Sequence, residues 1–345
     1  MSDGLVNRQI VLKSRPIGAA TVDNFELVRT PVPSLASGDG ENAAGQVLSR
    51  TLWLSLDPYM NVRIRGKTYA EPVPIGGVIV GRTVGRVIES RHPDYAPGDI
   101  VLTPGGVPGW QDYVVSTPER KVDPSLGPIS TALGALGMPG KTAYVGLLDI
   151  GQPKAGETVV VSSAAGAVGS LAGQMARLRG ARVVGIAGGP EKCRYVREEL
   201  GFDACVDYRA ADFAEALARA CPKGIDVYFE NVGGDVLQTV WPLLNDFARV
   251  PVCGLLAEYD DMSPRPGPSM RSVLNKRLTL QGFIVSDPAH LERTGDFLRD
   301  TSSWLRQGQV TLRQDVVEGL ERAPEGLVGL LAGRYSGKLV VRVAE

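Results

Sequence analysis

The sequence predicts an α/β protein with a doubly wound parallel sheet and a second domain made mainly of β-strands. From about residue 131 to residue 306, apolar β-branched runs alternate with helical patterns, as they do where helices join the strands of a parallel sheet. Residues 1 to about 130 hold short Val/Ile/Leu runs separated by Gly, Pro and Asp, which is typical of a β-barrel or β-sandwich. A length of 345 residues also favours two domains.

In the first part of the chain, the apolar runs predict strands, and the turn-forming phrase Tyr95–Asp99 precedes one of them. The predicted strands are Gln9–Lys13, Gln46–Leu56, Gly77–Val87, Asp99–Thr103 and Asp112–Ser116. A last strand, Gly337–Val343, follows a helical pattern at Gly326–Ala332 and is expected to return to this domain. The predicted domains are therefore residues 1–130 together with 311–345, and residues 131–310.

In the middle of the chain, strand and helix patterns alternate along the sequence. The predicted strands are Thr158–Ser162, Arg182–Ala187, Ala204–Asp207, Asp226–Asn231, Arg249–Cys253 and Leu278–Ile284. The predicted helices are Pro139–Leu148, Ala167–Arg179, Glu191–Leu200, Asp212–Cys221, Asp235–Leu244 and Ala289–Arg306. Residues 257–275 are rich in proline and polar side chains, and we expect a loop there.

Composition excludes several classes of protein. A formal net charge of −1 leaves no electrostatic footprint for nucleic acid or an anionic membrane. The sequence holds no apolar run long enough to span a membrane, and the first residues lack a signal-peptide core, so a cytoplasmic location is expected. The four cysteines show no C-x-x-C spacing, and His92 and His290 both fall in segments expected to be exposed. We therefore expect no metal site.

The segment from Glu157 to Lys192 carries the strongest functional signal. The strand-like run Val159–Val161 leads into a small-residue turn, and a helical pattern and a second strand follow, which makes one βαβ unit. The turn is a variant of G-x-G-x-x-G in which Ala164 takes the first glycine position and Gly166 and Gly169 keep the other two. Small residues let the backbone approach a pyrophosphate, and the N-terminus of the helix attracts it. This pattern predicts a dinucleotide-binding turn.

The end of the second strand indicates which dinucleotide binds. An NAD site usually places Asp or Glu there to accept a hydrogen bond from the ribose 2′-OH, but Ala187–Pro190 contains no acid, and Lys192 follows. A lysine beside an uncharged bend suits a 2′-phosphate, which a carboxylate would repel. We therefore expect NADPH. The alternative is that Lys192 is an ordinary solvated lysine.

Several phrases of the sequence resemble one known family, the zinc-independent medium-chain dehydrogenase/reductases. Within it they are most similar to the group of prostaglandin reductases, alkenal (enone) double-bond reductases and bacterial curcumin reductase-type proteins. The phrases span nearly the whole chain in the expected order: Leu54–Met60, Gly109–Tyr113, Gly137–Gly140, Thr142–Tyr144, Ala164–Ser170, Glu230–Gly234, Cys253–Tyr259 and Gly282–Val285.

The resemblance implies a GroES-like β-barrel domain and a Rossmann domain, with NADP(H) as cofactor. It also implies the cofactor-binding residues: Gly166, Ala167, Val168 and Gly169 at the pyrophosphate, Lys192 and Tyr208 at the 2′-phosphate, then Asn231, Cys253, Gly254, Phe283, Ile284 and Val285. One position departs from the family pattern G-x-N-x-G-K, because Tyr335 stands in the place of Asn and puts that cofactor contact in doubt. The family is often dimeric through sheet edges of the cofactor domain, so we expect a homodimer.

The expected reaction is reduction of the C=C bond of α,β-unsaturated ketones and aldehydes, with hydride delivered to the β-carbon. The enolate that develops needs a hydrogen-bond donor, and Tyr259 together with the ribose 2′-OH is expected to supply it. Tyr59, Trp110 and Tyr113 are candidates for the wall of the substrate pocket, although ordinary aromatic packing explains Trp110 and Tyr113 equally well. A quinone oxidoreductase and a non-catalytic NADPH-binding protein remain as alternatives.

Overall fold

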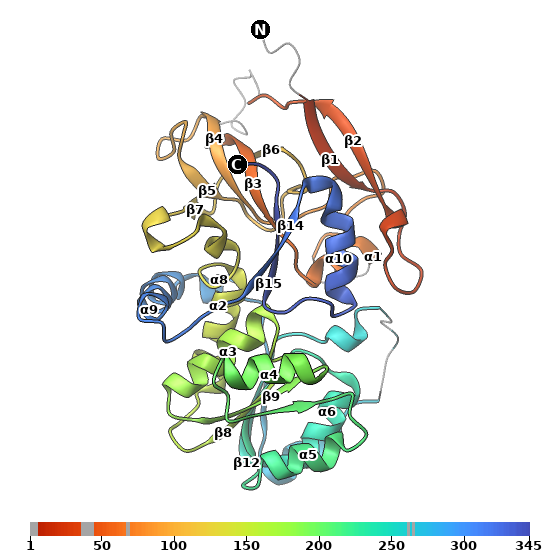
Figure 1. Cartoon of the computed structure of the whole chain (residues 1–345), viewed down its shortest axis with the longest axis vertical. Coiled ribbons are helices and arrows are strands. Elements are labelled where there is room, and N and C mark those ends of the chain that lie inside the picture. Colours follow the sequence, from red (N-terminus) through yellow and green to blue (C-terminus); the bar gives the residue numbers. More distant parts are fainter. Residues whose placement is uncertain (1–5, 36–44, 67–69, 261–262, 264–265) are drawn as a thin grey trace. The chain divides into compact units, whose positions relative to one another are not determined.

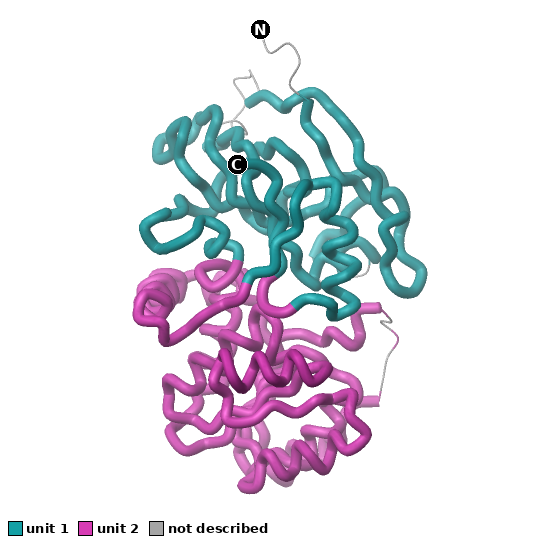
Figure 2. The backbone as a smooth tube through the Cα atoms, in the orientation of Figure 1, with its two compact units in different colours: residues 1–133, 314–335, 339–345 teal, residues 134–313, 336–338 magenta. Residues whose placement is uncertain are grey.

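The computed structural model describes residues 6–35, 45–66, 70–260, 263 and 266–345. The chain forms two compact units (Figure 2), the first of Met1–Leu133, Gln314–Tyr335 and Leu339–Glu345 and the second of Gly134–Arg313 and Ser336–Lys338. In the described part of the chain, no helix is long and apolar enough to cross a membrane.

The first unit is a GroES-like β domain. Its main sheet has the strand order β14-β15-β3-β4-β5-β7, with β6 paired to β3, and β1 and β2 form a separate pair. The strands are β1 (Val6–Leu12), β2 (Phe25–Pro31), β3 (Val47–Ser55), β4 (Thr83–Ser90), β5 (Ile100–Leu102), β6 (Tyr113–Ser116), β7 (Arg120–Lys121), β14 (Gln314–Glu318) and β15 (Lys338–Arg342). The predicted C-terminal strand is therefore confirmed, because β15 pairs antiparallel with β3. Helices α1 (Tyr59–Arg65) and α10 (Ala323–Leu331) contribute buried side chains to the core of this unit.

The second unit is a Rossmann domain with a parallel sheet in the order β10-β9-β8-β11-β12-β13. The strands are β8 (Thr158–Ser162), β9 (Arg182–Ala187), β10 (Ala204–Asp207), β11 (Ile225–Phe229), β12 (Leu244–Val252) and β13 (Thr279–Gly282). The direction of the strand order reverses between β8 and β11. Ligands of open α/β sheets bind at the carboxyl ends of the strands beside such a reversal.

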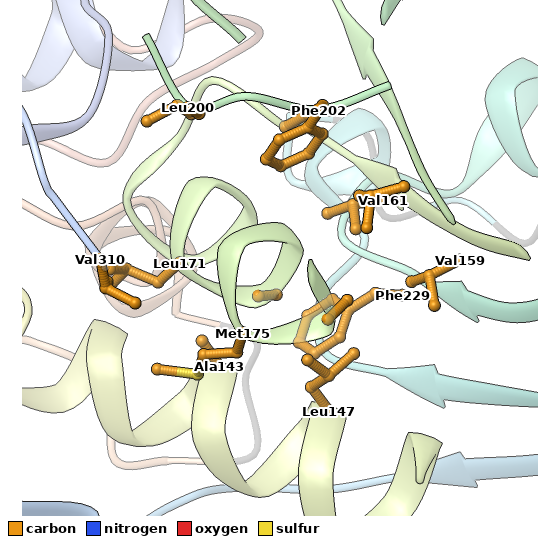
Figure 3. Close-up of a cluster of buried hydrophobic side chains, with 14 of the residues drawn as sticks. Ala143, Leu147, Val159, Val161, Leu171, Met175, Leu200, Phe202, Phe229 and Val310 are labelled. Carbon is orange, nitrogen blue, oxygen red and sulfur yellow. The ribbon is translucent and has the colours of Figure 1, made fainter. Parts of the chain in front are cut away.

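Helices cover both faces of this sheet (Figure 1). One face packs against α2 (Met138–Tyr144), α3 (Ala167–Leu178), α4 (Pro190–Glu198) and α9 (Thr294–Arg306), and the other against α5 (Phe213–Ala220), α6 (Gly234–Val240) and α7 (Met270–Lys276). Strand β8 is buried on both sides, since Val159 and Val161 face the first helical layer and Val160 the second. Figure 3 shows the cluster of buried apolar side chains between the sheet and the first helical layer, in which Leu171 and Met175 of α3 pack with Val161, Val159 and Phe229.

Several predicted elements differ from the observed ones. The loop expected over 257–275 ends earlier, because Ser269 caps α7 by accepting a hydrogen bond from the Arg271 N–H at 3.3 Å. The helix predicted at Pro139–Leu148 continues as a π-helix, Val145–Gly151. The helix predicted at Ala289–Arg306 is two helices, α8 (Pro288–Leu291) and α9. Strands β2, β7 and β14 were not predicted.

Candidate cofactor and substrate site

The small-residue turn lies between β8 and α3, beside the reversal of the strand order. Ser163 adopts the left-handed region with φ 51°, and its carbonyl accepts the Gly166 N–H at 2.9 Å. A Cβ atom built on Gly169 would lie 2.3 Å from that same carbonyl oxygen, so only glycine fits there. Ala167 and Val168 begin α3, whose first N–H groups have no partner within the helix. The turn therefore has the close approach and the donors that a pyrophosphate requires.

Gly337 completes this turn from a distant part of the chain. Its N–H donates to the Ala165 carbonyl at 2.7 Å, and it forms a parallel bridge with Gly166. Gly337 has φ 72°, and a Cβ atom there would lie 2.1 Å from the carbonyl oxygen of Arg313. Glycine is thus required at this position, which was not predicted as part of the site. The phrase Gly-Lys at the start of the last strand was the only sequence signal for it.

The acid-free bend after β9 is surrounded by basic and aromatic side chains. Lys192 is half-buried on α4, and Tyr208 is 43% exposed after β10. The Arg209 guanidinium lies 5.5 Å from the centre of the Tyr208 ring. A Cβ atom on Gly188 would lie 2.8 Å from the Tyr208 ring and 3.0 Å from Arg209 Nε, so both side chains pack over the bend. Arg209, which was not predicted, adds a second cation there.

One carboxylate, that of Asp207, does lie near this bend, but it accepts hydrogen bonds from backbone N–H groups. Asp207, the last residue of β10, accepts the Gly189 N–H at 2.8 Å and the Arg209 N–H at 2.9 Å through one oxygen. Tyr208 N–H in turn donates to the Ala187 carbonyl at 3.1 Å. Asp207 therefore holds the bend against the end of β10.

Asn231 and Glu230 follow β11 and are tied to the end of β8. The Asn231 backbone N–H donates to Ser162 Oγ at 2.8 Å, and its side-chain Nδ2 donates to the Ser162 carbonyl at 2.7 Å. Ser162 Oγ–H donates to Glu230 Oε1 at 3.0 Å, and the Val232 N–H donates to the same oxygen at 2.6 Å. The predicted cofactor residue Asn231 is therefore fixed at the strand reversal by a buried network.

Glu230 is the buried centre of this network. It is 1% exposed, and burial raises the pKa of its carboxyl group above the ordinary value. Its backbone carbonyl accepts the N–H groups of Cys253 at 2.8 Å and Gly254 at 3.2 Å. The strand ends of β8, β11 and β12 are thus joined through one residue. The Glu230 side chain makes structural hydrogen bonds to Ser162 and Val232.

Tyr259 lies beside Gly254. It follows a short 3₁₀ turn, Leu256–Glu258, whose N–H groups at Leu256 and Ala257 donate to the carbonyls of Asn231 and Val232 at 3.1 and 2.9 Å. A Cβ atom built on Gly254 would lie 3.3 Å from the Tyr259 hydroxyl oxygen. The structure therefore brings the predicted donor to the same edge of the sheet as Asn231 and Gly254.

Phe283, Ile284 and Val285 follow the edge strand β13. Phe283 is buried, and a Cβ atom on Gly146 would lie 2.5 Å from its ring, so the ring packs directly on the backbone of the π-helix. Ile284 and Val285 are half-buried. The His290 ring meets Phe283 edge-on at 6.1 Å. His290 and His92 are both half-buried, so the expectation that the two histidines are exposed was wrong.

The remaining predicted residues belong to the first unit. The Tyr59 hydroxyl donates to the Gly105 carbonyl at 3.3 Å, and Tyr113 is half-buried on β6. Tyr335 is half-buried and packs on α10, because a Cβ atom on Gly329 would lie 2.8 Å from its ring. Trp110 has no exposed surface and stacks on Phe25 with ring centres 5.9 Å apart. Trp110 is therefore a core residue, in agreement with the alternative of ordinary aromatic packing. The expectation that Trp110 lines the substrate pocket was wrong.

Within the described ranges, no group of three or more His, Cys, Asp or Glu side chains is arranged to hold a metal ion. The candidate site in the second unit consists of a glycine turn, a basic bend and a tyrosine, all at the carboxyl ends of parallel strands.

The fold and this turn define the second unit as a dinucleotide-binding domain of an oxidoreductase. Two family profiles match the chain, "N-terminal domain of oxidoreductase" over residues 8–123 and "Zinc-binding dehydrogenase" over residues 167–300. The chain belongs to the medium-chain dehydrogenase/reductases, in the zinc-independent enone reductase group.

Named relatives of this group match the chain over almost its full length. The NADPH-dependent curcumin reductase of Escherichia coli is 52% identical over 98% of this chain and 97% of its own. The NADP⁺-dependent 2-alkenal reductase of Nicotiana tabacum is 38% identical over 100% of this chain and 99% of its own. The crystal structure of CurA from Vibrio vulnificus in complex with NADPH is 49% identical, with a TM-score of 0.90 over 98% of this chain and 99% of that one.

Proposed function

We propose that this protein is an NADPH-dependent reductase of the C=C bond of α,β-unsaturated ketones and aldehydes. The relatives named as curcumin reductase and 2-alkenal reductase support the reaction class. The structural observation that carries the proposal is the Tyr259 hydroxyl beside Gly254, at the edge of the sheet where the cofactor turn lies.

The residues present fit NADP(H). Gly166 to Gly169 would hold the pyrophosphate, because a ligand can approach the backbone of this glycine turn closely and the first N–H groups of α3 have no partner within the helix. Lys192, Tyr208 and Arg209 would hold the 2′-phosphate at the acid-free bend. Asn231, Cys253 and Gly254 would lie along the cofactor, with Phe283 to Val285 flanking the nicotinamide. When bound, the cofactor supplies the hydride.

Tyr259 would stabilise the negative charge that develops on the carbonyl oxygen of the substrate. A tyrosine hydroxyl is protonated at neutral pH and carries no charge, so it donates a hydrogen bond without a counter-charge to remove. This bond strengthens as the enolate forms, which lowers the barrier more than it tightens substrate binding. Protonation of the α-carbon then completes the reduction. Tyr59 and Tyr113 remain candidates for the wall of the substrate pocket.

The assay follows NADPH absorbance with an aliphatic enone, with a quinone and with no acceptor. We expect oxidation with the enone. Oxidation with the quinone alone would assign the protein as a quinone oxidoreductase, and tight NADPH binding without turnover would make it a non-catalytic binding protein.

The variant Tyr259→Phe tests the proposed donor. It should lower kcat on the enone by about 10-fold or more while KM changes little, because the lost bond acts mainly in the transition state. Tyr95→Phe, a tyrosine of the first unit near His92, is the matched control and should keep the kcat of the native protein. An unchanged kcat in Tyr259→Phe would remove Tyr259 from the mechanism.

We also propose that the protein is a homodimer formed through the second unit. Strand β13 ends the parallel sheet, and all four of its residues are exposed. Exposed apolar side chains lie on the elements near this edge: Phe247 on β12, Met270 and Leu274 on α7, and Leu280 on β13. An exposed edge strand with apolar neighbours is a surface on which a second copy can pair.

A further inference from the structure

Two cysteines of the Rossmann domain face each other beside the acid-free bend. Cys193 lies on α4 and Cys205 on β10, and the Cys205 thiol donates to Cys193 Sγ at 3.1 Å. Cys193 is 7% exposed and Cys205 is half-buried. A disulfide needs a sulfur–sulfur separation of about 2.05 Å, so an approach of roughly 1 Å would join the pair.

The two elements that carry these thiols are held in register. The Gly189 N–H, just before α4, donates to Asp207 at the end of β10, and the Tyr208 N–H donates to the Ala187 carbonyl at the end of β9. The thiols therefore face each other because of the fold around them. Two cysteines fixed in this way form a disulfide much faster than two cysteines on mobile segments.

The pair is electronically asymmetric. The hydrogen bond that Cys193 accepts from Cys205 lowers the pKa of the Cys193 thiol, and the positive charge of Arg197 acts in the same direction. The pKa of the Cys205 thiol is raised, because it donates that bond and is partly buried. This asymmetry favours Cys193 over Cys205 as the thiol that ionises first.

We propose that Cys193 and Cys205 are a peroxide-reactive dithiol that closes reversibly to a disulfide. The Cys193 thiolate attacks one oxygen of hydrogen peroxide or an organic hydroperoxide, the O–O bond breaks, and a sulfenic acid and hydroxide (or alkoxide) form. The Cys205 sulfur then attacks the Cys193 sulfur and forms the S–S bond. The OH group leaves as water with the Cys205 proton. Two thiols lose two electrons in total, and the peroxide gains them.

The disulfide would also change cofactor binding, and this second part rests on the proposed NADPH site. Lys192 immediately precedes Cys193, and Tyr208 follows Cys205 by three residues. Drawing α4 toward β10 displaces the groups that would hold the 2′-phosphate. Oxidation should therefore weaken NADPH binding several-fold and leave NADH binding nearly unchanged.

The first experiment treats the reduced full-length protein with hydrogen peroxide, blocks remaining thiols with N-ethylmaleimide and records the mass. The chain has four cysteines, so the oxidised protein should take up two labels fewer than the reduced one. Cleavage after glutamate should then give fragments 192–198 and 200–215 joined by a bond that dithiothreitol breaks. Cys193→Ser and Cys205→Ser should each abolish the joined fragment, and Cys221→Ser, the matched control, should retain it.

Uptake of four labels after peroxide treatment, or a sulfinic acid on Cys193 without the joined fragment, would overturn the proposal.

The second experiment measures NADPH and NADH dissociation constants for reduced, oxidised and re-reduced protein. A joined fragment with unchanged NADPH affinity would overturn the link to the cofactor and support the modification site alone. Equal affinity of the reduced protein for NADPH and NADH would instead contradict the proposed 2′-phosphate site, and the mass measurement does not depend on that result.

Discussion

The side chains proposed for binding and chemistry in the Rossmann domain lie on the loops that follow the carboxyl ends of strands. Asn231 and Tyr208 come directly after β11 and β10, and Tyr259 comes after β12 and the 3₁₀ turn Leu256–Glu258. The Asn231 N–H donates to Ser162 Oγ at the end of β8, and the Tyr208 N–H donates to the Ala187 carbonyl at the end of β9, so these two positions are fixed to neighbouring strands.

Lys192→Ala tests the 2′-phosphate assignment. A charge-assisted hydrogen bond contributes about 1.5–3 kcal/mol, so the NADPH dissociation constant should rise about 10- to 100-fold while that of NADH changes little. Fluorescence titration of both cofactors measures this. Lys154→Ala removes an exposed lysine of the same unit and should change neither constant. Equal weakening of NADPH and NADH would indicate that Lys192 does not recognise the phosphate.

Glu230→Gln tests the buried network through pH. Because burial raises the pKa of Glu230 in the folded protein, the native state binds more protons than the unfolded chain between the ordinary and the raised pKa. The contribution of Glu230 to stability is thus greatest below the ordinary glutamate pKa and is lost as pH rises through the raised one.

Glutamine has no such proton to lose. Denaturant unfolding over a series of pH values should show Glu230→Gln gaining stability relative to the native protein as pH rises from the acid side through that window. Glu199→Gln, an exposed glutamate of the same unit, should follow the native protein at every pH. A constant difference between the Glu230→Gln and native curves would show that the carboxyl does not titrate there.

At the scale of elements, local patterns predicted the βαβ unit accurately. Strands β8, β9 and β10 have the predicted bounds, because each is a contiguous apolar run between turn residues. Patterns failed where a contact outside the segment decides its conformation. The π-helix Val145–Gly151 forms where the rings of Phe283 and Phe229 pack against Gly146. Both rings come from distant parts of the chain, so the local sequence could not predict this contact.

Gly173 gives an element-scale prediction for α3. A Cβ atom there would lie 1.8 Å from the Phe202 ring, which is buried among the apolar side chains that pack on α3. Because this space is already filled, Gly173→Ala should lower the free energy of unfolding by about 1–3 kcal/mol. Gly295→Ala in α9 is the matched control, because no atom lies within 4 Å of its added Cβ. That variant should be unchanged or up to about 1 kcal/mol more stable. Chemical denaturation measures the free energy of unfolding of both variants. An equal change in Gly173→Ala and Gly295→Ala would refute the packing argument.

At the scale of the whole molecule, the exposed edge of the second unit predicts association. Leu274 is 76% exposed and Leu280 43% exposed near this edge. The double variant Leu274→Lys, Leu280→Lys should convert a dimer to a monomer in sedimentation velocity, because buried lysines repel across the pair. Val316→Lys, a similarly exposed residue on β14 of the first unit, should remain dimeric. A native protein that sediments as a monomer would reject the proposed dimer.

The sequence by itself determined the features that depend on neighbouring residues. The glycine turn, the acid-free bend with Lys192, and the alternation of strands and helices could be predicted because local backbone geometry follows from local residue types. Only the tertiary structure decided the contacts between distant segments. Gly337 meets Ala165, Arg209 packs over Gly188, and Trp110 is buried against Phe25. The thiols of Cys193 and Cys205 meet because α4 packs on β10. Such contacts depend on strand order and on packing between elements, which no single stretch of sequence encodes.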